Sequence, residues 1–303
     1  MNSKKTNPHS DPFRARNGTS PVFRQCCTAL LIGLAALNLS DAATVYQNTF
    51  DDSGCLSDFA VYGEEFESYD PPPLHSVSID AGQLRIDTDY LRPNGPTSYP
   101  VLSGRAFLSV DTSATFTPGY NASLSRNNGL ISWSFNVSNQ NGTFNNAFSC
   151  VLASTMADPY DINADGYTFN AGGMVGNRMV IKRFDYGLGG GGEMLIDIEA
   201  GLGPLPDKGS FKITFDPATS EWSLYGETGP EYVDPTQVDS LLGTAIDSTY
   251  TDVETKYFGL LGKTTGINYF DNVTVDVVPE PASILFIFFT FLGAGFLRRR
   301  IIR

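Results

Sequence analysis

The sequence predicts an all-β protein, folded as a two-sheet antiparallel sandwich over residues 43–278. Short runs rich in β-branched and aromatic residues follow one another there, and several alternate apolar with polar side chains. Glycine- and proline-rich stretches separate these runs, and no stretch shows sustained helical periodicity. A period of two is typical of half-buried antiparallel strands, and about a dozen strands in one domain favour two packed sheets.

The expected strands follow one another along the chain, with turn residues between them. They cover residues 44–50, 76–80, 83–88, 104–111, 129–137, 147–155, 166–170, 177–185, 194–200, 210–216, 221–226, 256–262 and 267–277. Alternation is clearest where Phe211, Ile213 and Phe215 share one face of a run. The stretch DPATSEW predicts a hairpin turn between two of these strands.

The N-terminus predicts a secretory signal peptide spanning residues 1–42. A basic region precedes the uncharged run CCTALLIGLAALNL, and small residues follow at Ser40 and Ala42. A membrane-spanning helix needs about 20 apolar residues, which is more than this run offers. We therefore expect signal peptidase to cleave after Ala42.

Residues 279–303 read as a transmembrane helix with unusual flanks. In order, they contain Pro279, Glu280, Pro281, an uncharged apolar stretch, and then Arg298, Arg299 and Arg300. The two prolines deny helix to the triplet and leave it extended. The arginines are expected to stay on the cytoplasmic side of a membrane, which places the body outside the cytoplasm.

The tail VPEPASILFIFFTFLGAGFLRRR resembles the PEP-CTERM sorting signal in all three of its parts. In that family an exosortase, a membrane-embedded transpeptidase-like enzyme of Gram-negative bacteria, recognises the tail. The resemblance implies an exported protein held first at the inner membrane by its C-terminal helix. It is then processed near the triplet and moved to the cell surface or extracellular matrix.

The body is acidic. The whole chain carries a formal net charge of −13, and many of its basic residues lie in the two terminal segments. Such a surface repels phosphate backbones, which excludes nucleic acid as a partner and favours cations such as calcium. After signal removal Cys55 and Cys150 remain, and in an oxidising compartment they permit either a disulfide or two buried thiols.

The order of strands in the body resembles concanavalin-A-like and laminin-G-like domains. The features that carry this resemblance are ISWSFNV, FSCVLAST, DGYTFN, RMVIKRFDYGL, FKITFDPATSEWSLYG and the closing FDNVTV. It implies a jelly-roll sandwich whose last strand pairs beside the first. It supports the fold more strongly than any particular function.

The stretch DINADGYTF is the most suggestive for binding. Asp161, Asn163 and Asp165 are spaced like the start of a calcium loop, although position twelve is glycine where an EF-hand needs glutamate. Two interpretations stay open. One is a loose calcium site formed by Asp158, Asp161, Asn163 and Asp165, and the other is an acidic solvated turn.

The same stretch is similar to the A-D-G-x-[AT]-F segment of legume-type lectins. That resemblance implies that Asp165, followed by Gly166 and Tyr167, contacts sugar hydroxyls. A third motif, EMLIDIEA, offers Glu193, Asp197 and Glu199, but the first carboxylate is four residues before the second, where retaining glycanases need two.

The sequence therefore predicts an exported, surface-sorted, non-catalytic β-sandwich that binds or organises extracellular polysaccharide. One alternative is a structural matrix protein without a specific ligand, suggested by the acidic body. The other is a glycan-cleaving hydrolase that uses Asp197 and Glu199. The expected partners are signal peptidase, an exosortase-type enzyme, the membrane and extracellular polysaccharide, and calcium is the one cofactor considered.

Overall fold

The described part of the chain belongs to a single compact unit. The computed structural model describes residues 42–64, 76–91, 101–103, 105–139, 148–172, 178–199, 208–263 and 267–278. The chain divides into two units, Met1–Ser40 and Asp41–Arg303, and all the described residues lie in the second. None of the helices in these ranges has the length and apolar character needed to cross a membrane.

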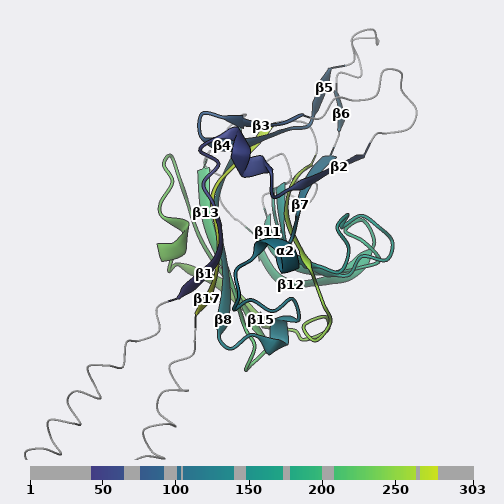
Figure 1. Ribbon diagram of the computed structural model, residues 1–303, viewed down its shortest axis with the longest axis vertical. Helices are drawn as coiled ribbons and strands as arrows, with labels where there is room; N and C mark the ends of the chain where they lie inside the picture. Colours follow the sequence, from purple (N-terminus) through teal and green to yellow (C-terminus); the bar gives the residue numbers. More distant parts are fainter. Residues whose placement is uncertain are drawn as a thin grey trace, which may run out of the picture. The chain divides into compact units, whose positions relative to one another are not determined.

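Strands dominate this unit, and its helices are single short turns (Figure 1). The elements are β1 (Ala43–Asn48), η1 (Ser53–Leu56), β2 (Ala60–Glu64), β3 (Ser76–Asp80), β4 (Gln83–Asp87), β5 (Asp89–Leu91), β6 (Val101–Ser103), β7 (Arg105–Asp111), α2 (Thr112–Thr115), η2 (Leu124–Arg126), β8 (Leu130–Asn139), β9 (Phe148–Ser154), β10 (Gly166–Ala171), β11 (Arg178–Asp185), β12 (Gly191–Glu199), β13 (Lys208–Asp216), β14 (Glu221–Gly229), η3 (Pro235–Gln237), β15 (Leu241–Ile246), β16 (Tyr257–Lys263) and β17 (Ile267–Val278).

Two antiparallel sheets pack face to face, which confirms the predicted two-sheet sandwich. Sheet A has eight strands, in the order β15-β14-β13-β8-β17-β4-β3, with β1 paired to the second half of β17. Sheet B has seven strands, in the order β12-β11-β10-β9-β16-β7-β2. The expected pairing of the last strand beside the first is present, because Ala43 of β1 lies opposite Val277 of β17.

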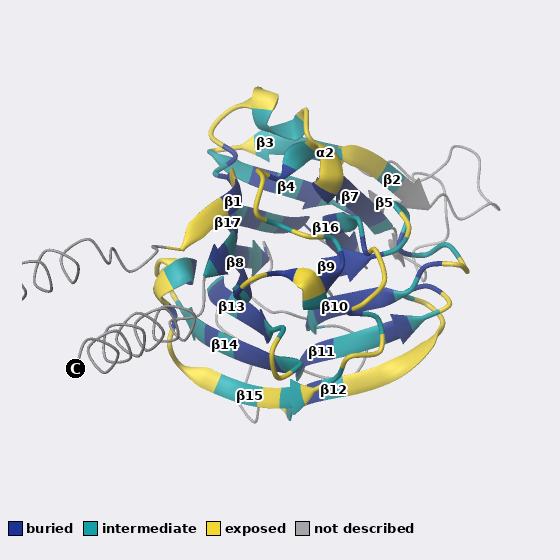
Figure 2. Ribbon diagram, turned by 60° about the horizontal axis from the view of Figure 1, so that its bottom comes forward, coloured by how far each residue is buried: buried dark blue, intermediate teal, exposed yellow. Residues whose placement is uncertain are grey.

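The core is filled by the inward-facing side chains of both sheets. In sheet A these include Trp133, Phe211 and Trp222, all buried, and the two indoles stack with ring centroids 5.9 Å apart. The ring centroid of Tyr167 in sheet B lies 4.4 Å from that of Trp222, and the ring centroid of Phe169 in the same strand lies 5.0 Å from that of Phe211. Figure 2 shows these central strands buried, whereas the outer strands β12 and β15 are largely exposed.

Every strand predicted from the sequence is present, with ends that agree to within a few residues. The DPATSEW turn is also confirmed, since Asp216 at the end of β13 lies opposite Glu221 at the start of β14. Four strands were missed, namely β2, β5, β6 and β15. The strands β2 and β15 lie at sheet edges and β5 pairs only with β6, so each depends on a single neighbour.

Candidate functional site

The acidic stretch forms the loop between β9 and β10, and its carboxylates hydrogen-bond locally. Asp158 Oδ1 accepts a hydrogen bond from the backbone N–H of Tyr160 at 2.9 Å. Asp161 Oδ1 accepts from the backbone N–H and the side-chain amide of Asn163, each at 2.8 Å. These are Asx turns, in which an aspartate caps the backbone two residues further along the chain.

The same loop was predicted to offer a calcium site, and its aspartates point to separate partners. Asp165 Oδ1 accepts from the backbone N–H of Tyr186 at 3.1 Å, away from the turns capped by Asp158 and Asp161. In the described ranges, no group of three or more His, Cys, Asp or Glu side chains is placed to hold a metal ion. Calcium binding by Asp158, Asp161, Asn163 and Asp165 stays a prediction.

Asp165 connects this loop to the glycine-rich end of the β11–β12 hairpin. The hairpin end also donates two backbone hydrogen bonds to the loop, from Gly187 to the carbonyl of Ala164 at 2.7 Å and from Leu188 to the carbonyl of Pro159 at 2.8 Å. Gly187 has φ +85°, and a Cβ there would lie 2.8 Å from the carbonyl oxygen of Asp161. Only glycine fits such a position, which explains part of the glycine run.

Only the first residue of the predicted sugar-contacting segment is placed to meet a ligand. Asp165 is half-buried, but Tyr167 is fully buried in β10. A Cβ on Gly166 would lie 2.0 Å from the carbonyl oxygen of Ala153, so this glycine permits close strand packing. The prediction that Tyr167 contacts a sugar is therefore wrong, because its ring packs against Trp222 between the sheets.

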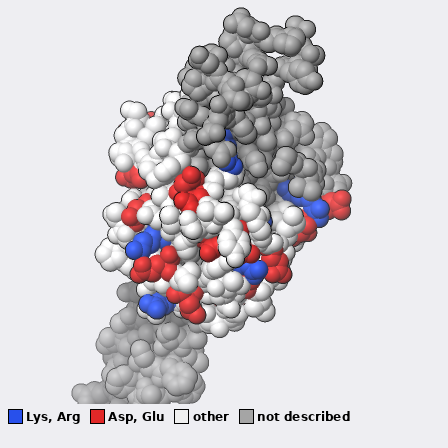
Figure 3. Space-filling model, turned by 90° about the vertical axis from the view of Figure 1, so that its right-hand side faces the viewer, with Lys and Arg blue, Asp and Glu red and all other residues white. Residues whose placement is uncertain are grey.

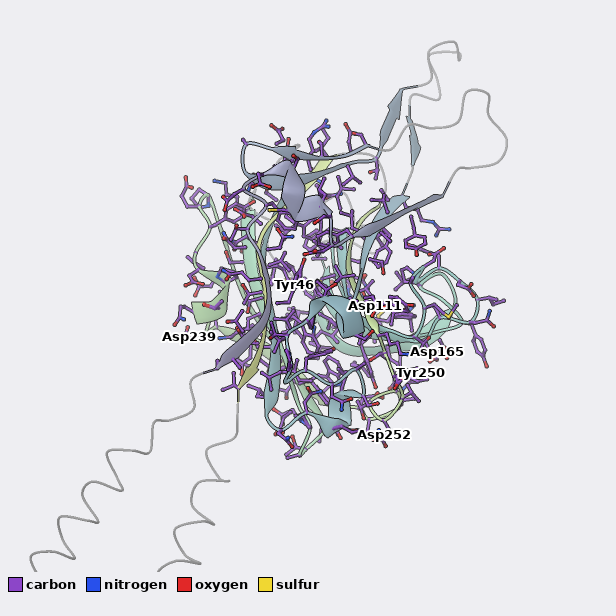
Figure 4. The ribbon with its side chains drawn as sticks, in the orientation of Figure 1. Tyr46, Asp111, Asp165, Asp239, Tyr250 and Asp252 are labelled. Atoms are coloured by element: carbon purple, nitrogen blue, oxygen red, sulfur yellow. The ribbon has the colours of Figure 1, made fainter. Side chains whose placement is uncertain are left out.

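A polar network that the sequence did not reveal lies beside this loop. Asp247, just after β15, accepts hydrogen bonds from the Tyr167 hydroxyl at 2.6 Å and from Arg183 Nη1 at 2.8 Å. The Tyr250 hydroxyl donates a hydrogen bond to Asp185 Oδ1 at 2.6 Å. In the view of Figure 4, Tyr250 and Asp165 of the acidic loop are neighbours. Burial alone would raise the pKa of Asp247, but hydrogen bonds from Tyr167, the Thr249 backbone and Arg183 outweigh it and hold this pKa below its usual value.

A recess also lies elsewhere, on the outer face of sheet A. This sheet A groove has a volume of about 890 Å³ and lies between the strands and the loop 230–240, which contains η3. Its strand-borne lining is mostly hydroxyl and amide side chains, namely Thr44, Gln47, Ser132, Asn136, Thr214, Asn272 and Thr274, together with Lys212 and Asp276. Its loop-borne lining includes Tyr232, Asp234, Thr236 and Asp239.

The loop that walls the groove is tied to β13. The Ser210 hydroxyl donates to the carbonyl of Val233 and accepts from its N–H, both at 3.1 Å. Lys212 Nζ donates to the carbonyl of Thr236 at 3.3 Å and lies 5.0 Å above the Tyr225 ring. Burial lowers the pKa of Lys212, and the nearby carboxylates of Asp239 and Asp234 act in the opposite direction.

Two buried polar groups on the outer face of β8 lack hydrogen-bond partners among the described residues. Asn136 is 2% exposed and lines the groove, yet its Oδ1 has no hydrogen-bond partner among the described residues. Ser134, on the same face of β8, is 1% exposed, and its hydroxyl is likewise unpartnered there. Buried polar groups are normally hydrogen-bonded, and of these two residues only Asn136 lines the groove, so its Oδ1 is the candidate acceptor for a group that enters there.

The glycanase-like carboxylates lie on β12 at the edge of sheet B and not in the groove. Asp197 Oδ1 accepts a hydrogen bond from Arg178 Nε at 2.7 Å, and Glu193 lies 3.3 Å from Arg183 Nη1. Asp197 and Glu199 do share a strand face, as the sequence predicted. Neither of them lines the sheet A groove.

The two remaining cysteines are free thiols, so the disulfide that the sequence permitted is absent. Cys55 is half-buried in η1, whereas Cys150 is fully buried in the centre of β9 between Phe169 of β10 and Leu260 of β16. Burial in this apolar setting raises the pKa of the Cys150 thiol and makes it unreactive.

The terminal predictions lie outside the described residues, except at one point. These predictions are the signal peptide before residue 42, the triplet Pro279, Glu280 and Pro281, the C-terminal helix, and Arg298, Arg299 and Arg300. Ala42 is exposed and directly precedes β1, so cleavage after it would leave every strand intact.

No family model and no curated protein matches this chain. Among solved structures it is similar to the T. cruzi calreticulin globular domain, with 12% identity and a TM-score of 0.46, covering 83% of this chain and 94% of that chain. It is also similar to the CBM2 module of the evolved Dit of Lactobacillus casei BL23 phage J-1, with 10% identity, a TM-score of 0.45 and coverage of 79% and 98%.

A third similar structure is arcelin-5, a lectin-like defense protein from Phaseolus vulgaris, with 11% identity, a TM-score of 0.43 and coverage of 77% and 98%. These likenesses are distant. The two-sheet fold stated above therefore rests on the strand pairing of this chain itself.

Proposed function

We propose that this protein is an exported, surface-sorted, non-catalytic β-sandwich that binds extracellular polysaccharide in the sheet A groove. The observation that carries the proposal is the groove itself, an open recess of about 890 Å³ lined by hydroxyl and amide side chains. Polysaccharides present rows of hydroxyl groups, and hydroxyl and amide side chains can both donate to them and accept from them. The groove follows the sheet face, which suits an extended polymer.

Aromatic side chains at the groove support the same ligand class. Tyr225 of β14 and Tyr232 of the loop both line it, and both are half-buried. A tyrosine offers an apolar ring face together with a polar tip. A sugar ring, which has an apolar face and hydroxyl edges, matches that combination.

The arrangement of carboxylates supports binding without catalysis. Asp276 in the groove accepts a hydrogen bond from the Thr44 hydroxyl at 2.7 Å, and Asp234 caps η3 by accepting from the backbone N–H of Thr236 at 3.0 Å. These two groups thus have structural partners. In sheet B, Asp197 and Glu193 of β12 lie against arginines of the neighbouring strand β11.

A pair of tyrosine variants tests where a polysaccharide binds. Tyr225→Ala removes a ring from the groove, and Tyr186→Ala removes the 71% exposed ring of the hairpin end that Asp165 holds. We expect glycan-array binding by the full-length chain to be lost with the first change and kept with the second. The reverse result would move the site to the lectin-like loop, and no binding by the wild type, with or without calcium, would refute polysaccharide binding.

Surface sorting is a separate part of the proposal and has its own test. The tail that resembles a PEP-CTERM signal suggests an exosortase as partner and the outer surface as destination. Intact mass of the protein from its native host should show a C-terminus near Pro279–Pro281 after loss of residues 1–42. A mass that still includes Arg303 would indicate a plain membrane anchor.

The exposed sheet edges favour a second candidate, a structural matrix protein that assembles with itself. Met194 on β12 and Leu241 and Ile246 on β15 are more than half exposed, at 52%, 55% and 74%. Each of these strands forms one edge of its sheet, and sheet edges with exposed apolar side chains promote association. Concentration-dependent assembly without any glycan binding would favour this candidate.

A further inference from the structure

The outer face of β8 carries more buried polar groups than the described residues satisfy. Ser132, Ser134 and Asn136 alternate along this face, and all three are at most 6% exposed. Asn136 Oδ1 is an acceptor only, and it lies in the lining of the sheet A groove. A molecule that satisfies it must therefore bring a hydrogen-bond donor to this point.

The charges around the groove specify the donor further. Asp234, Asp239 and Asp276 line the groove, whereas Lys212 is its one cationic lining residue among those described. The Lys212 ammonium is held between the Thr236 carbonyl and the Tyr225 ring. The groove therefore has a surplus of negative charge, as the chain as a whole does. Figure 3 shows that Asp and Glu side chains are also spread over another face of the protein.

We propose that the sheet A groove selects polysaccharides that carry free amino groups, with an ammonium donating to Asn136 Oδ1 near the groove carboxylates. This inference rests on the proposed function and names the ligand class of that site. An ammonium has three donors and no acceptor, so it suits the unpartnered acceptor Asn136 Oδ1 and a rim that presents carboxylates. Hydrogen bonds with one charged partner are stronger than neutral ones, which gives the preference its physical basis.

The position of Asp239 makes the electrostatic part of the inference testable. This residue is exposed and lies at the loop wall on the outer side of sheet A, far from Asp165 in the view of Figure 4. Replacing it with asparagine removes one charge without opening the core. Asp80→Asn at the exposed end of β3 makes the same charge change outside the groove and serves as the matched control.

The first measurement compares three probes on the full-length chain in detergent, at mildly acidic pH where a sugar amine is protonated. The probes are oligomers of glucosamine, of N-acetylglucosamine and of glucose. We expect the glucosamine oligomer to bind at least about tenfold more tightly than the other two, as one charge-assisted hydrogen bond would give. Equal or tighter binding of the acetylated or neutral oligomer overturns the amino-sugar preference but keeps the proposed function, whereas binding of no oligomer at all refutes both.

The second measurement separates specific binding from attraction to an acidic protein. Asn136→Ala should weaken glucosamine-oligomer binding about tenfold while leaving the melting temperature close to that of the wild type, because Oδ1 has no hydrogen-bond partner to lose within the described ranges. Asp239→Asn should also weaken binding, and Asp80→Asn should not. Equal losses in Asp239→Asn and Asp80→Asn, or wild-type affinity in both Asn136→Ala and Asp239→Asn, would overturn the inference.

Discussion

The Tyr167 hydroxyl of sheet B donates a hydrogen bond to Asp247 Oδ1 at 2.6 Å, and Asp247 directly follows the edge strand β15 of sheet A. The same hydroxyl accepts from the backbone N–H of Tyr250 at 3.0 Å. One phenol group therefore connects the two sheets and fixes the start of the segment that leads back to β16. A residue whose sequence context resembles a lectin motif serves here as an internal support.

Tyr167→Phe should lower the free energy of unfolding by about 1–3 kcal/mol, because it leaves buried partners without their hydrogen bonds. Tyr250→Phe is the matched control, since it removes a phenol hydroxyl whose one hydrogen-bond partner among the described residues is Asp185. We expect the control to cost less than about 1 kcal/mol, as is usual for a partly exposed pair. Urea unfolding of both variants makes the comparison, and equal losses would contradict the bridging role of Tyr167.

The Asp247 carboxylate should make the fold sensitive to acid. Its pKa is lower in the folded protein than its usual value, so its stabilising contribution is complete above the usual aspartate range near pH 4. That contribution is lost as the pH falls through the lower folded pKa. Melting temperature measured from neutral pH downward should therefore decline less steeply in Asp247→Asn than in the wild type, and parallel declines would exclude this role.

The Asx turn at Asp161 allows calcium binding to be separated from local capping. Asp161→Asn keeps an oxygen that can accept from the Asn163 N–H but removes the charge, whereas Asp161→Ala removes both. If the loop is only a turn, Asp161→Asn should melt like the wild type, and Asp161→Ala should lose about 0.5–1.5 kcal/mol. A calcium-dependent rise in melting temperature that occurs in the wild type and is absent from Asp161→Asn would instead establish the calcium site.

The free thiols predict an unequal response to alkylation. Cys55 is half-buried and should react with a maleimide in the folded protein, whereas Cys150 is fully buried and its raised pKa keeps it protonated. Peptide mapping should find Cys150 modified only after unfolding in denaturant without reductant. A Cys150 that needs reductant before it reacts would point to a disulfide.

Local sequence was sufficient for most strands but not for the edges. Runs such as 210–216 alternate because one face meets the opposite sheet, so the pattern is visible without the partner. The strand β15 reads LLGTAI, with a central Gly243 and with Leu241 and Ile246 exposed. Its structure depends on backbone pairing with β14, and such pairing leaves little trace in the sequence of the strand itself.

For the candidate site too, some features could be predicted from local sequence and others could not. The sequence by itself determined the sandwich, the turn-forming aspartates of the loop after β9, and the expectations for both termini, because each follows from neighbouring residues. The tertiary structure decided that Tyr167 is internal, that Cys55 and Cys150 stay apart, and that a groove forms on sheet A. That groove combines Thr44, Asn136, Lys212, Asp239 and Asp276, which come from distant parts of the chain. No local sequence pattern predicts this groove, because its residues come together only when the strand order and the path of the loop 230–240 are fixed.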